Sequence, residues 1–309
     1  MDHSNVTLPT HFIITGILDK PWLQVFIFLL VLLIYLTALG GNVTIFLLVC
    51  LDHRLHTPMY FFLANLSILD MCCSTITLHK TLISFISGDS KISVLECHLQ
   101  IFAYLSLTVD EMLLLTAMSY DRYVAICNPL RYNVVMNFKL CIFLAFICWF
   151  LSFLEGIPVF TEIFRIICYT SNKIDHFFCD IMPVIKLACS DTSFLQIYIL
   201  IGGAFVTGFT PFCLTFVSYI FIISTILSIR SSTGRRKAFY TCSSHLTVVI
   251  IQYASLAIQY LRPPSAIDLG SNKYFSLVNV AAVPILNPLI YSLKNKDVKA
   301  AIRRRIKSI

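Results

Sequence analysis

The sequence predicts an all-α membrane protein, a seven-transmembrane helix bundle with a short amphipathic C-terminal helix. Three observations predict this fold class. Of the 309 residues, 58% are hydrophobic and only 13% are charged, whereas soluble domains carry about 25% charged residues. Four long stretches contain no charge at all, and three further apolar stretches contain few. The apolar runs are continuous rather than alternating, which favours helices over a membrane β-barrel.

Each apolar stretch is long enough, or nearly long enough, to cross a bilayer as a helix, which takes about 20 residues. In chain order the spans are expected at Pro21–Leu51, near Pro58–Ser84, near Leu99–Ala125, from Leu140 through Leu154 and past Glu155, and at Thr192–Ile229, Ala238–Leu261 and Tyr274–Leu293. The stretch from Lys296 to Lys307 is basic and mildly amphipathic. It predicts a short helix on the inner leaflet of the membrane.

The distribution of lysine and arginine predicts the orientation. If the N-terminus is extracellular, most of the 23 basic residues fall on the cytoplasmic side, as the positive-inside rule requires. We therefore expect a multi-pass protein of the plasma membrane, with one domain over 1–309: an extracellular tail (1–21), the helix bundle (22–293) and a cytoplasmic tail (294–309). The net charge of +7 then reflects topology in a lipid bilayer, and no nucleic acid is expected as a partner.

The expected outer side carries two kinds of modification site. Residues 1–20 are polar and lack the apolar core and cleavage site of a signal peptide. Asn5 begins the sequon Asn5-Val6-Thr7 in this tail, which predicts a glycosylation site. Four of the twelve cysteines also fall outside the spans: Cys97, Cys168, Cys179 and Cys189. An even number in an oxidising compartment predicts two disulfides, with three possible pairings. A metal site is the alternative, because His176 lies three residues before Cys179.

Four segments carry a resemblance to a known family. They are MSYDRYVAICNPLRY at Met118–Tyr132, LHTPMYFFLANLSILD at Leu55–Asp70, KAFYTCSSHLTVV at Lys237–Val249 and PILNPLIYSLKN at Pro284–Asn295. The chain resembles the olfactory (odorant) receptors, a branch of the rhodopsin-like G-protein-coupled receptors. The resemblance implies a receptor for small volatile odorants that activates a stimulatory heterotrimeric G protein and raises cyclic AMP. It also implies the disulfides Cys97–Cys179 and Cys168–Cys189.

Polar residues within the spans are expensive in hydrocarbon and therefore mark function. Asp70 lies near the middle of the second span, and Glu111 lies eleven residues before Arg122, on the same helical face. With hydroxyls and Asn287, the two carboxylates could hold a sodium ion, and the resemblance implies such a pocket in the resting state. The alternative is that they share a proton. No other cofactor is expected. Asp110 departs from the family pattern and points about 100° away from Glu111.

The cytoplasmic half is expected to carry the switch. Asp121 and Arg122 form an acid–base pair at the boundary of a span, where unpaired charge is costly. Pro288 removes a backbone donor and bends the seventh span, which makes it a plausible place for two packings of similar energy. The residues assigned to the switch and to G-protein coupling are Asp121, Arg122, Tyr123, Tyr219, Asn287, Pro288 and Tyr291.

The outer half is expected to carry the ligand cavity. Tyr104, Thr108 and Glu111 follow helical spacing, so one face of the third span lines the interior. The resemblance implies that Tyr253 is the toggle under the ligand. The complete expected lining is mostly apolar with a few hydroxyls and suits a small, weakly polar molecule: Tyr104, Leu105, Thr108, Val109, Val206, Thr207, Tyr253, Leu256, Ala257, Tyr260, Leu277 and Val280.

Three residues of the sequence depart from the family pattern, and two other functions are alternatives to odorant reception. Gln252, Ala254 and Asn279 stand where the family usually has other residues. The chain has none of the common hydrolase, phosphate-loop or dinucleotide motifs, so no enzymatic activity is expected. A chemosensory receptor outside smell is one alternative. An ion-coupled transporter that uses Asp70, Asp110 and Glu111 is another, but seven spans and no internal repeat argue against it.

Overall fold

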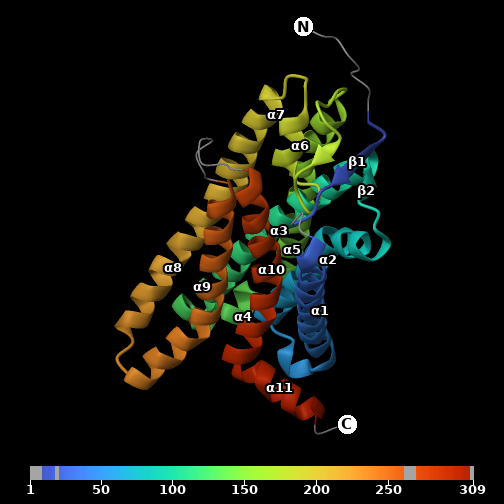
Figure 1. Ribbon diagram of the computed structural model, residues 1–309. Helices are drawn as coiled ribbons and strands as arrows, with labels where there is room; N and C mark the ends of the chain where they lie inside the picture. Colours follow the sequence, from blue (N-terminus) through green and yellow to red (C-terminus); the bar gives the residue numbers. More distant parts are fainter. Residues whose placement is uncertain (1–8, 18–20, 261–268, 307–309) are drawn as a thin grey trace.

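The computed structural model describes residues 9–17, 21–260 and 269–306, and it contains seven helices long and apolar enough to cross a membrane (Figure 1). This confirms the predicted fold class. In chain order these helices are α1 (Pro21–Leu51), α2 (Pro58–Ser87), α3 (Val94–Cys127), α5 (Phe138–Phe164), the continuous helix α7–η3–α8 (Ser193–Tyr198, Ile199–Phe209, Thr210–Ser228), α9 (Ser232–Tyr260) and α10 (Leu269–Lys294).

Shorter elements close the two ends of the bundle. They are the strands β1 (His11–Ile14), β2 (Lys91–Ser93) and β3 (Lys173–Ile174), the short helices η1 (His53–Leu55), η2 (Pro129–Arg131), α4 (Tyr132–Val135) and α6 (Ile181–Leu187), and the C-terminal helix α11 (Lys296–Ile306). Figure 1 shows β1, β2 and α6 at the end near the N-terminus and α11 across the opposite end. The predicted C-terminal helix is therefore present.

The bundle buries polar groups and exposes apolar ones. Asn42, Asp70 and Asn287 are at most 2% exposed, whereas large apolar side chains such as Val25 and Phe205 are more than half exposed. A protein in water would show the reverse. The outward apolar surface is matched to lipid, and the buried polar groups find partners inside the bundle.

Local sequence signals set several helix boundaries. Ser93 and Glu96 form a capping box at the start of α3, with Ser93 Oγ accepting from the Glu96 amide. Asn137 caps α5 by accepting from the Leu140 amide. The second span ends at Gly88, whose φ of +69° is in the left-handed region that favours glycine. These caps make the helices longer than the apolar stretches that predicted them.

The fifth span is not a uniform α-helix. Its middle segment η3 is a π-helix, directly before the turn that carries Pro211. Proline has no amide hydrogen, so Pro211 cannot complete the α-helical ladder of the preceding turn. Wide π turns are rare and are frequently found at functional sites. The apolar composition of this span predicted a helix but gave no sign of this geometry.

The seventh span is hydrogen-bonded to the first at a point where proline interrupts its backbone hydrogen bonds. Because Pro288 cannot donate to the carbonyl of Pro284, that carbonyl is free to accept another bond. Asn42 Nδ2 supplies it at 2.9 Å. A Cβ at Gly41 would lie 2.8 Å from Pro288 Cγ, so this close approach of α1 and α10 requires glycine. The amide of Asn42 thereby has a partner inside the bundle, as a polar group in a membrane span requires.

A three-stranded sheet ties the N-terminal tail to the outer loops. Strand β1 lies between β2, with which it is antiparallel, and β3, with which it is parallel. The sequence did not predict any strand in this tail, which was expected only to be polar. The disulfides Cys97–Cys179 and Cys168–Cys189 lie at the same end and connect α3 to the loop, and the loop to itself.

Candidate functional site: a lidded outer cavity and an inner lock

The outer lining begins with a cluster of buried apolar residues from several elements. Tyr104, Val280, Phe177 and Phe178 belong to one cluster, and Leu277 packs against it. The rings of Tyr104 and Phe178 meet edge to face with centroids 5.0 Å apart. Two predicted lining elements, α3 and α10, therefore share a contact region with the long outer loop, which supplies Phe177 and Phe178.

The loop segment from Asp175 to Cys179 forms a lid, and buried polar contacts hold it in place. Thr81 Oγ1 donates to the Phe177 carbonyl at 2.7 Å, and the Cys179 amide donates to Gln100 Oε1 at 2.9 Å. Lys273 Nζ, only 7% exposed, pairs with Asp175 Oδ1 at 2.9 Å. The lid is thus connected to α2, α3 and α10, which surround the expected cavity.

Two titratable groups in the lid have shifted pKa values. Burial opposes ionisation of Asp175, but hydrogen bonds from Lys273 and Thr15 and the charge of Lys273 outweigh it and hold the pKa of Asp175 below its ordinary value. Burial lowers the pKa of His176 to about 3. His176 is neutral at neutral pH and its Nδ1 accepts weakly from the Phe178 amide, at 3.4 Å. A metal at His176 and Cys179 is disfavoured, because Cys179 is bonded to Cys97.

The other predicted lining residues are distributed over three helices. Leu105, Thr108 and Val109 on α3, Thr207 on η3, and Tyr253, Leu256 and Ala257 on α9 are all half-buried. These side chains are therefore not part of the fully buried core of the bundle. Tyr253 packs edge to face on Phe212 of α8, with centroids 5.1 Å apart, so this tyrosine connects α9 to the fifth span.

Val206 and Tyr260 are the remaining predicted lining residues of the fifth and sixth spans. Val206 is 58% exposed, as much as its neighbour Phe205. An exposure of this size is typical of lipid-facing positions. Tyr260 ends α9, but its side chain lies outside the described residues, as does the predicted glycosylation site Asn5.

The predicted acidic pair lies in the bundle interior, and each carboxylate has an amide partner. Asn287 Nδ2 donates to Asp70 Oδ2 at 3.0 Å, and Gln252 Nε2 donates to Glu111 Oε2 at 2.8 Å. Gln252 is one of the departures from the family pattern, and in this chain its side chain holds Glu111 through this hydrogen bond. Asp110 is fully buried, and neither of its oxygens has a hydrogen-bond partner in the described part of the chain.

At the opposite end of α3, Asp121, Arg122 and Tyr132 form a bonded group, the lock, with Asp121 at its centre. Asp121 is fully buried, forms an ion pair with Arg122, accepts from Arg122 Nε at 2.8 Å and accepts from the Tyr132 hydroxyl at 2.7 Å. Tyr132 belongs to α4, so the lock joins α3 to the inner loop. The predicted pair is present, whereas the contribution of Tyr132 was not foreseen.

Two further switch residues lie in the interior beside this lock. The hydroxyl of Tyr219 lies 2.7 Å from His245 Nδ1 of α9, so the fifth and sixth spans are connected by a buried bond. Tyr291 is 1% exposed, and its hydroxyl has no partner in the region that the structure describes. Tyr123 packs against Phe221 at 6.0 Å between centroids. These tyrosines surround the inner end of α3.

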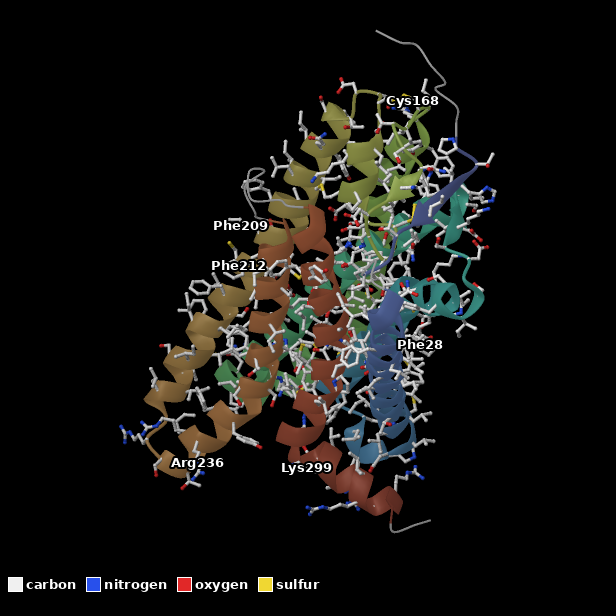
Figure 2. The ribbon with its side chains drawn as sticks, viewed as in Figure 1. Phe28, Cys168, Phe209, Phe212, Arg236 and Lys299 are labelled. Carbon is white, nitrogen blue, oxygen red and sulfur yellow. A yellow bond between two sulfur atoms is a disulfide. The ribbon has the colours of Figure 1, made fainter. Side chains whose placement is uncertain are left out.

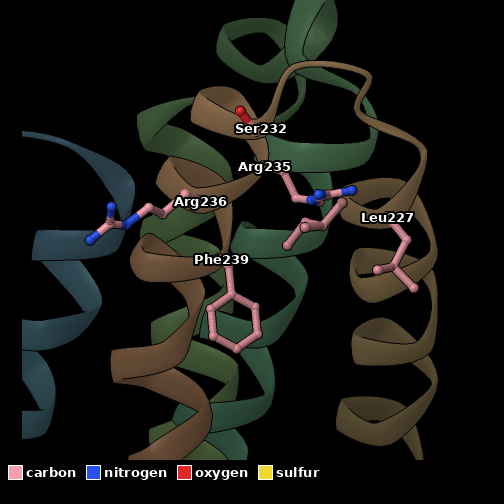
Figure 3. A pocket seen from close by; sticks show the side chains of 6 residues that line it. Leu227, Ser232, Arg235, Arg236 and Phe239 are labelled. Atoms are coloured by element: carbon pink, nitrogen blue, oxygen red, sulfur yellow. The ribbon is translucent and has the colours of Figure 1, made fainter.

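A cavity of about 350 Å³ opens between the inner ends of α8 and α9 (Figure 3). Its lining combines apolar side chains with two arginines and a hydroxyl: Ile226, Leu227, Phe239, Arg235, Arg236 and Ser232. Figure 2 shows that Arg236 and Lys299 of α11 lie at the same end of the molecule, opposite Cys168. The basic end of the bundle is therefore the end that carries the lock.

Sequence reasoning missed one polar residue of the outer half. Glu155, in α5, has its Oε1 bonded by the predicted lining residue Thr207 at 2.9 Å. Its Oε2 is buried and has no partner among the described residues. The available signal was Glu155 itself, which is the only acidic residue of the apolar stretch from Leu140 to Val159. The sequence predicts that this span extends past Glu155, and α5 continues nine residues beyond it, to Phe164.

Seven membrane-spanning helices with a lidded lining at one end and a buried arginine lock at the other define the class of seven-helix membrane receptors. The model of the olfactory receptor family matches residues 31–308. The chain is 45% identical to human olfactory receptor 6C1 over 96% of this chain and 95% of the relative. It is 46% identical to human olfactory receptor 2A12, over 97% of both chains. It is 45% identical to mouse olfactory receptor 5G9, over 99% of this chain and 97% of the relative.

The chain therefore belongs to the olfactory receptor family, as the sequence motifs had indicated. This family consists of multi-pass membrane receptors and not of enzymes or transporters, so the transporter alternative is set aside. The family assignment supports a role as an odorant receptor.

Proposed function

We propose that this chain binds small volatile odorants in the outer half of the bundle and activates a stimulatory heterotrimeric G protein, which raises cyclic AMP. The observation that carries the proposal is the contrast between the two ends of α3. Tyr104 lies in the lidded, mostly apolar region, and Asp121 lies in the buried lock about five helical turns away. A single rigid helix thus connects a ligand site to a coupling site.

The proposed mechanism is a shift between two conformations. A ligand favours the active conformation only by binding it better than the resting one. Tyr253 belongs to the proposed lining and packs on Phe212 of the fifth span, so it is positioned to transmit that preference to α9. Movement of α9 would break the bond between Tyr219 and His245 and release Arg122 from Asp121.

The released Arg122 and the cavity between α8 and α9 would then form the surface for the G protein. Arg235 and Arg236 give this surface positive charge and Phe239 gives it apolar area, a combination that is common at the centre of protein interfaces. Asn287, Pro288 and Tyr291 form the proposed hinge of the seventh span, where the backbone ladder is already interrupted.

We propose the topology that places the lid outside the cell and α11 in the cytoplasm. In this arrangement residues 1–21 are the extracellular tail, 22–293 the bundle and 294–309 the cytoplasmic tail, and Asn5 carries a glycan. An N-terminal epitope should then be stained in intact cells. A mass shift on deglycosylation should disappear in Asn5→Gln. Staining that requires permeabilised cells would contradict this orientation.

Asp70 and Glu111 fit a sodium ion by their donor chemistry, because carboxylate oxygens suit a hard cation. Glu111 Oε1 has no partner among the described residues, so it is free to face an ion. We propose that sodium there stabilises the resting conformation. Replacing external sodium by N-methylglucamine should then increase odorant potency in the native receptor but not in Asp70→Asn. No increase in the native receptor would indicate that the acids share a proton instead, and an equal increase in both would show that sodium acts at another place.

The test of coupling uses Arg122→Ala. The variant should reach the cell surface but give no cyclic AMP response to any odorant that activates the native receptor. Arg165→Ala is the matched control, because Arg165 is exposed at the outer end and pairs with Glu162. A full response of Arg122→Ala at normal surface level would refute the coupling role. Responses only to non-volatile molecules would favour a chemosensory receptor outside smell.

A further inference from the structure

Glu155 is a carboxylate in the outer part of α5 that belongs neither to the lock nor to the pair of Asp70 and Glu111. Thr207 Oγ1 donates to its Oε1 at 2.9 Å. Its Oε2 is buried and has no hydrogen-bond partner in the described residues. No lysine or arginine in the described part of the chain forms an ion pair with it. A buried carboxylate oxygen without a partner is costly, so the position calls for a ligand group.

The surroundings of Glu155 are arranged to keep its carboxylate in place. The hydroxyl of Tyr198 donates to the Glu155 carbonyl at 3.2 Å, which fixes α5 against α7. A Cβ added at Gly202 would lie 3.7 Å from Glu155 Oε1 and 3.5 Å from the Tyr198 ring. Both are ordinary van der Waals distances, so the π-helix η3 passes within contact range of the carboxylate at Gly202.

The carboxylate also lies beside residues of the expected ligand lining. Its bonded partner Thr207 is one of them. Leu105 of α3, another, packs against the same apolar cluster as Tyr198. The π-helical geometry of η3 turns Thr207 toward α5, since Thr207 bonds Glu155 while also bonding the Gly203 carbonyl at 3.1 Å. Rare π turns of this kind mark functional sites in many proteins.

We propose that Glu155 is the polar anchor of the ligand cavity and that it selects small volatile amines. This inference rests on the proposed odorant-receptor function and specifies its ligand class. An amine suits the site whichever form the carboxyl takes. An ammonium ligand pairs with a carboxylate, and a neutral amine accepts the proton of a carboxylic acid, so both routes end in the same charge-assisted hydrogen bond. The apolar residues of the lining hold the hydrocarbon part of the ligand.

Asp110 is another acid whose carboxylate oxygens have no hydrogen-bond partner among the described residues, and it differs from Glu155 in location. It is fully buried, whereas Glu155 is half-buried and bonded to a lining residue. We therefore assign the ligand role to Glu155, and Asp110→Asn serves as a control for the loss of a buried carboxylate. Glu162→Gln is the control for the same substitution on the same helix, because Glu162 pairs with exposed Arg165.

The experiment measures cyclic AMP in cells that carry the full chain, with surface level determined for each variant. The probes are isobutylamine, isopentylamine and cyclohexylamine, each paired with the alcohol of the same shape. The native receptor should prefer amines to their alcohols. Glu155→Gln should raise the amine EC50 by about 10- to 100-fold, the value of one hydrogen bond to a charged group. Alcohol responses, and the ratio of amine to alcohol in both control variants, should stay unchanged.

The readout is the amine-to-alcohol ratio within one variant, so altered folding or surface level does not change it. Partial recovery of the ratio in Glu155→Asp would support the assignment further. Responses to alcohols with no response to amines would overturn the inference and leave the odorant-receptor function standing. The same would follow from an amine preference that survives Glu155→Gln. Silence to both series at normal surface level would count against the inference and the proposed function together.

Discussion

The two ends of the bundle are held together by different kinds of interaction. At the outer end, two disulfides, a three-stranded sheet and buried rings connect the lid to the helices. At the inner end, the connections are single hydrogen bonds and ion pairs, such as Tyr132 to Asp121 and Tyr219 to His245. Covalent bonds do not exchange during signalling, whereas hydrogen bonds exchange readily with water or another partner. The comparison indicates a fixed ligand end and a switchable coupling end.

The largest effect is expected at the covalent end. Cys97→Ser removes the bond that joins α3 to Cys179 across 82 residues, whereas Cys168→Ser opens a loop of only 21. In the chain-entropy model these losses cost about 4–5 and about 3 kcal/mol. We expect Cys97→Ser to abolish surface expression and Cys168→Ser to reduce it, as measured by flow cytometry with an N-terminal epitope.

Cys50→Ser is the control, because Cys50 is an exposed free cysteine and its replacement should change nothing. An equal loss from both disulfide variants would mean that loop length does not determine their contribution. Normal expression of Cys97→Ser would show that the outer end does not depend on its covalent link, and the contrast between the ends would fail.

The second prediction concerns the lid at low pH. His176 has a folded pKa of about 3 against an ordinary value of about 6.5. The imidazole of His176 therefore binds a proton more readily in the opened lid than in the closed one. Its contribution to the stability of the closed lid is complete above about pH 6.5 and is lost as the pH falls toward 3. Between pH 7.5 and 5 the loss should be about 2 kcal/mol. Hydrogen exchange of the amides in 174–178 should accelerate accordingly.

His176→Gln is the control for this effect, since glutamine keeps an acceptor but does not titrate in this range. Asp175 also has a lowered pKa, but its contribution is present above about pH 3.9 and is lost only at more acidic pH. A lid that opens equally in both forms between pH 7.5 and 5 would show that His176 is not the responsible group.

The lid also shows where sequence reasoning reached its limit. The seven spans followed from continuous apolar runs, because bilayer thickness sets helix length, and the C-terminal helix followed from its basic, amphipathic sequence. The pairing of His11–Ile14 with β2 and β3 did not follow, because strand pairing depends on which distant loops come together. The short apolar group Phe12, Ile13 and Ile14 in a polar tail was the only available signal.

The candidate site divides in the same way. Asp121, Arg122 and the pair of Asp70 and Glu111 could be named from the sequence, because charge within an apolar run is conspicuous. Tyr132 and Gln252 could not be named as partners, since Tyr132 folds back from the inner loop onto Asp121 and Gln252 reaches Glu111 from α9. The position of Thr207 opposite Glu155 depends on π-helical geometry, and periodicity assumes an ordinary helix.

The third prediction tests the lock. Tyr132→Phe removes one hydrogen bond to the Asp121 carboxylate but leaves its ion pair with Arg122 in place. A hydrogen bond to a charged group contributes about 1.5 kcal/mol, which corresponds to about tenfold in an equilibrium. Because the bond is proposed to stabilise the resting conformation, basal cyclic AMP should rise while surface level stays normal. Unchanged basal activity would show that the bond is kept in both conformations.

The smallest effect is expected where the inner end meets solvent. Arg304 of α11 pairs with Asp52 at 2.5 Å, and its side chain is 37% exposed. Exposed ion pairs typically contribute less than about 1 kcal/mol, and α11 is also held by the Tyr60 hydroxyl, which bonds Asn295 at 2.9 Å. Arg304→Gln should therefore leave both melting temperature and cyclic AMP potency nearly unchanged in physiological salt. A large loss of signalling at normal stability would instead place Arg304 in the coupling surface, which would then extend from the lock to α11 rather than end at the cavity between α8 and α9.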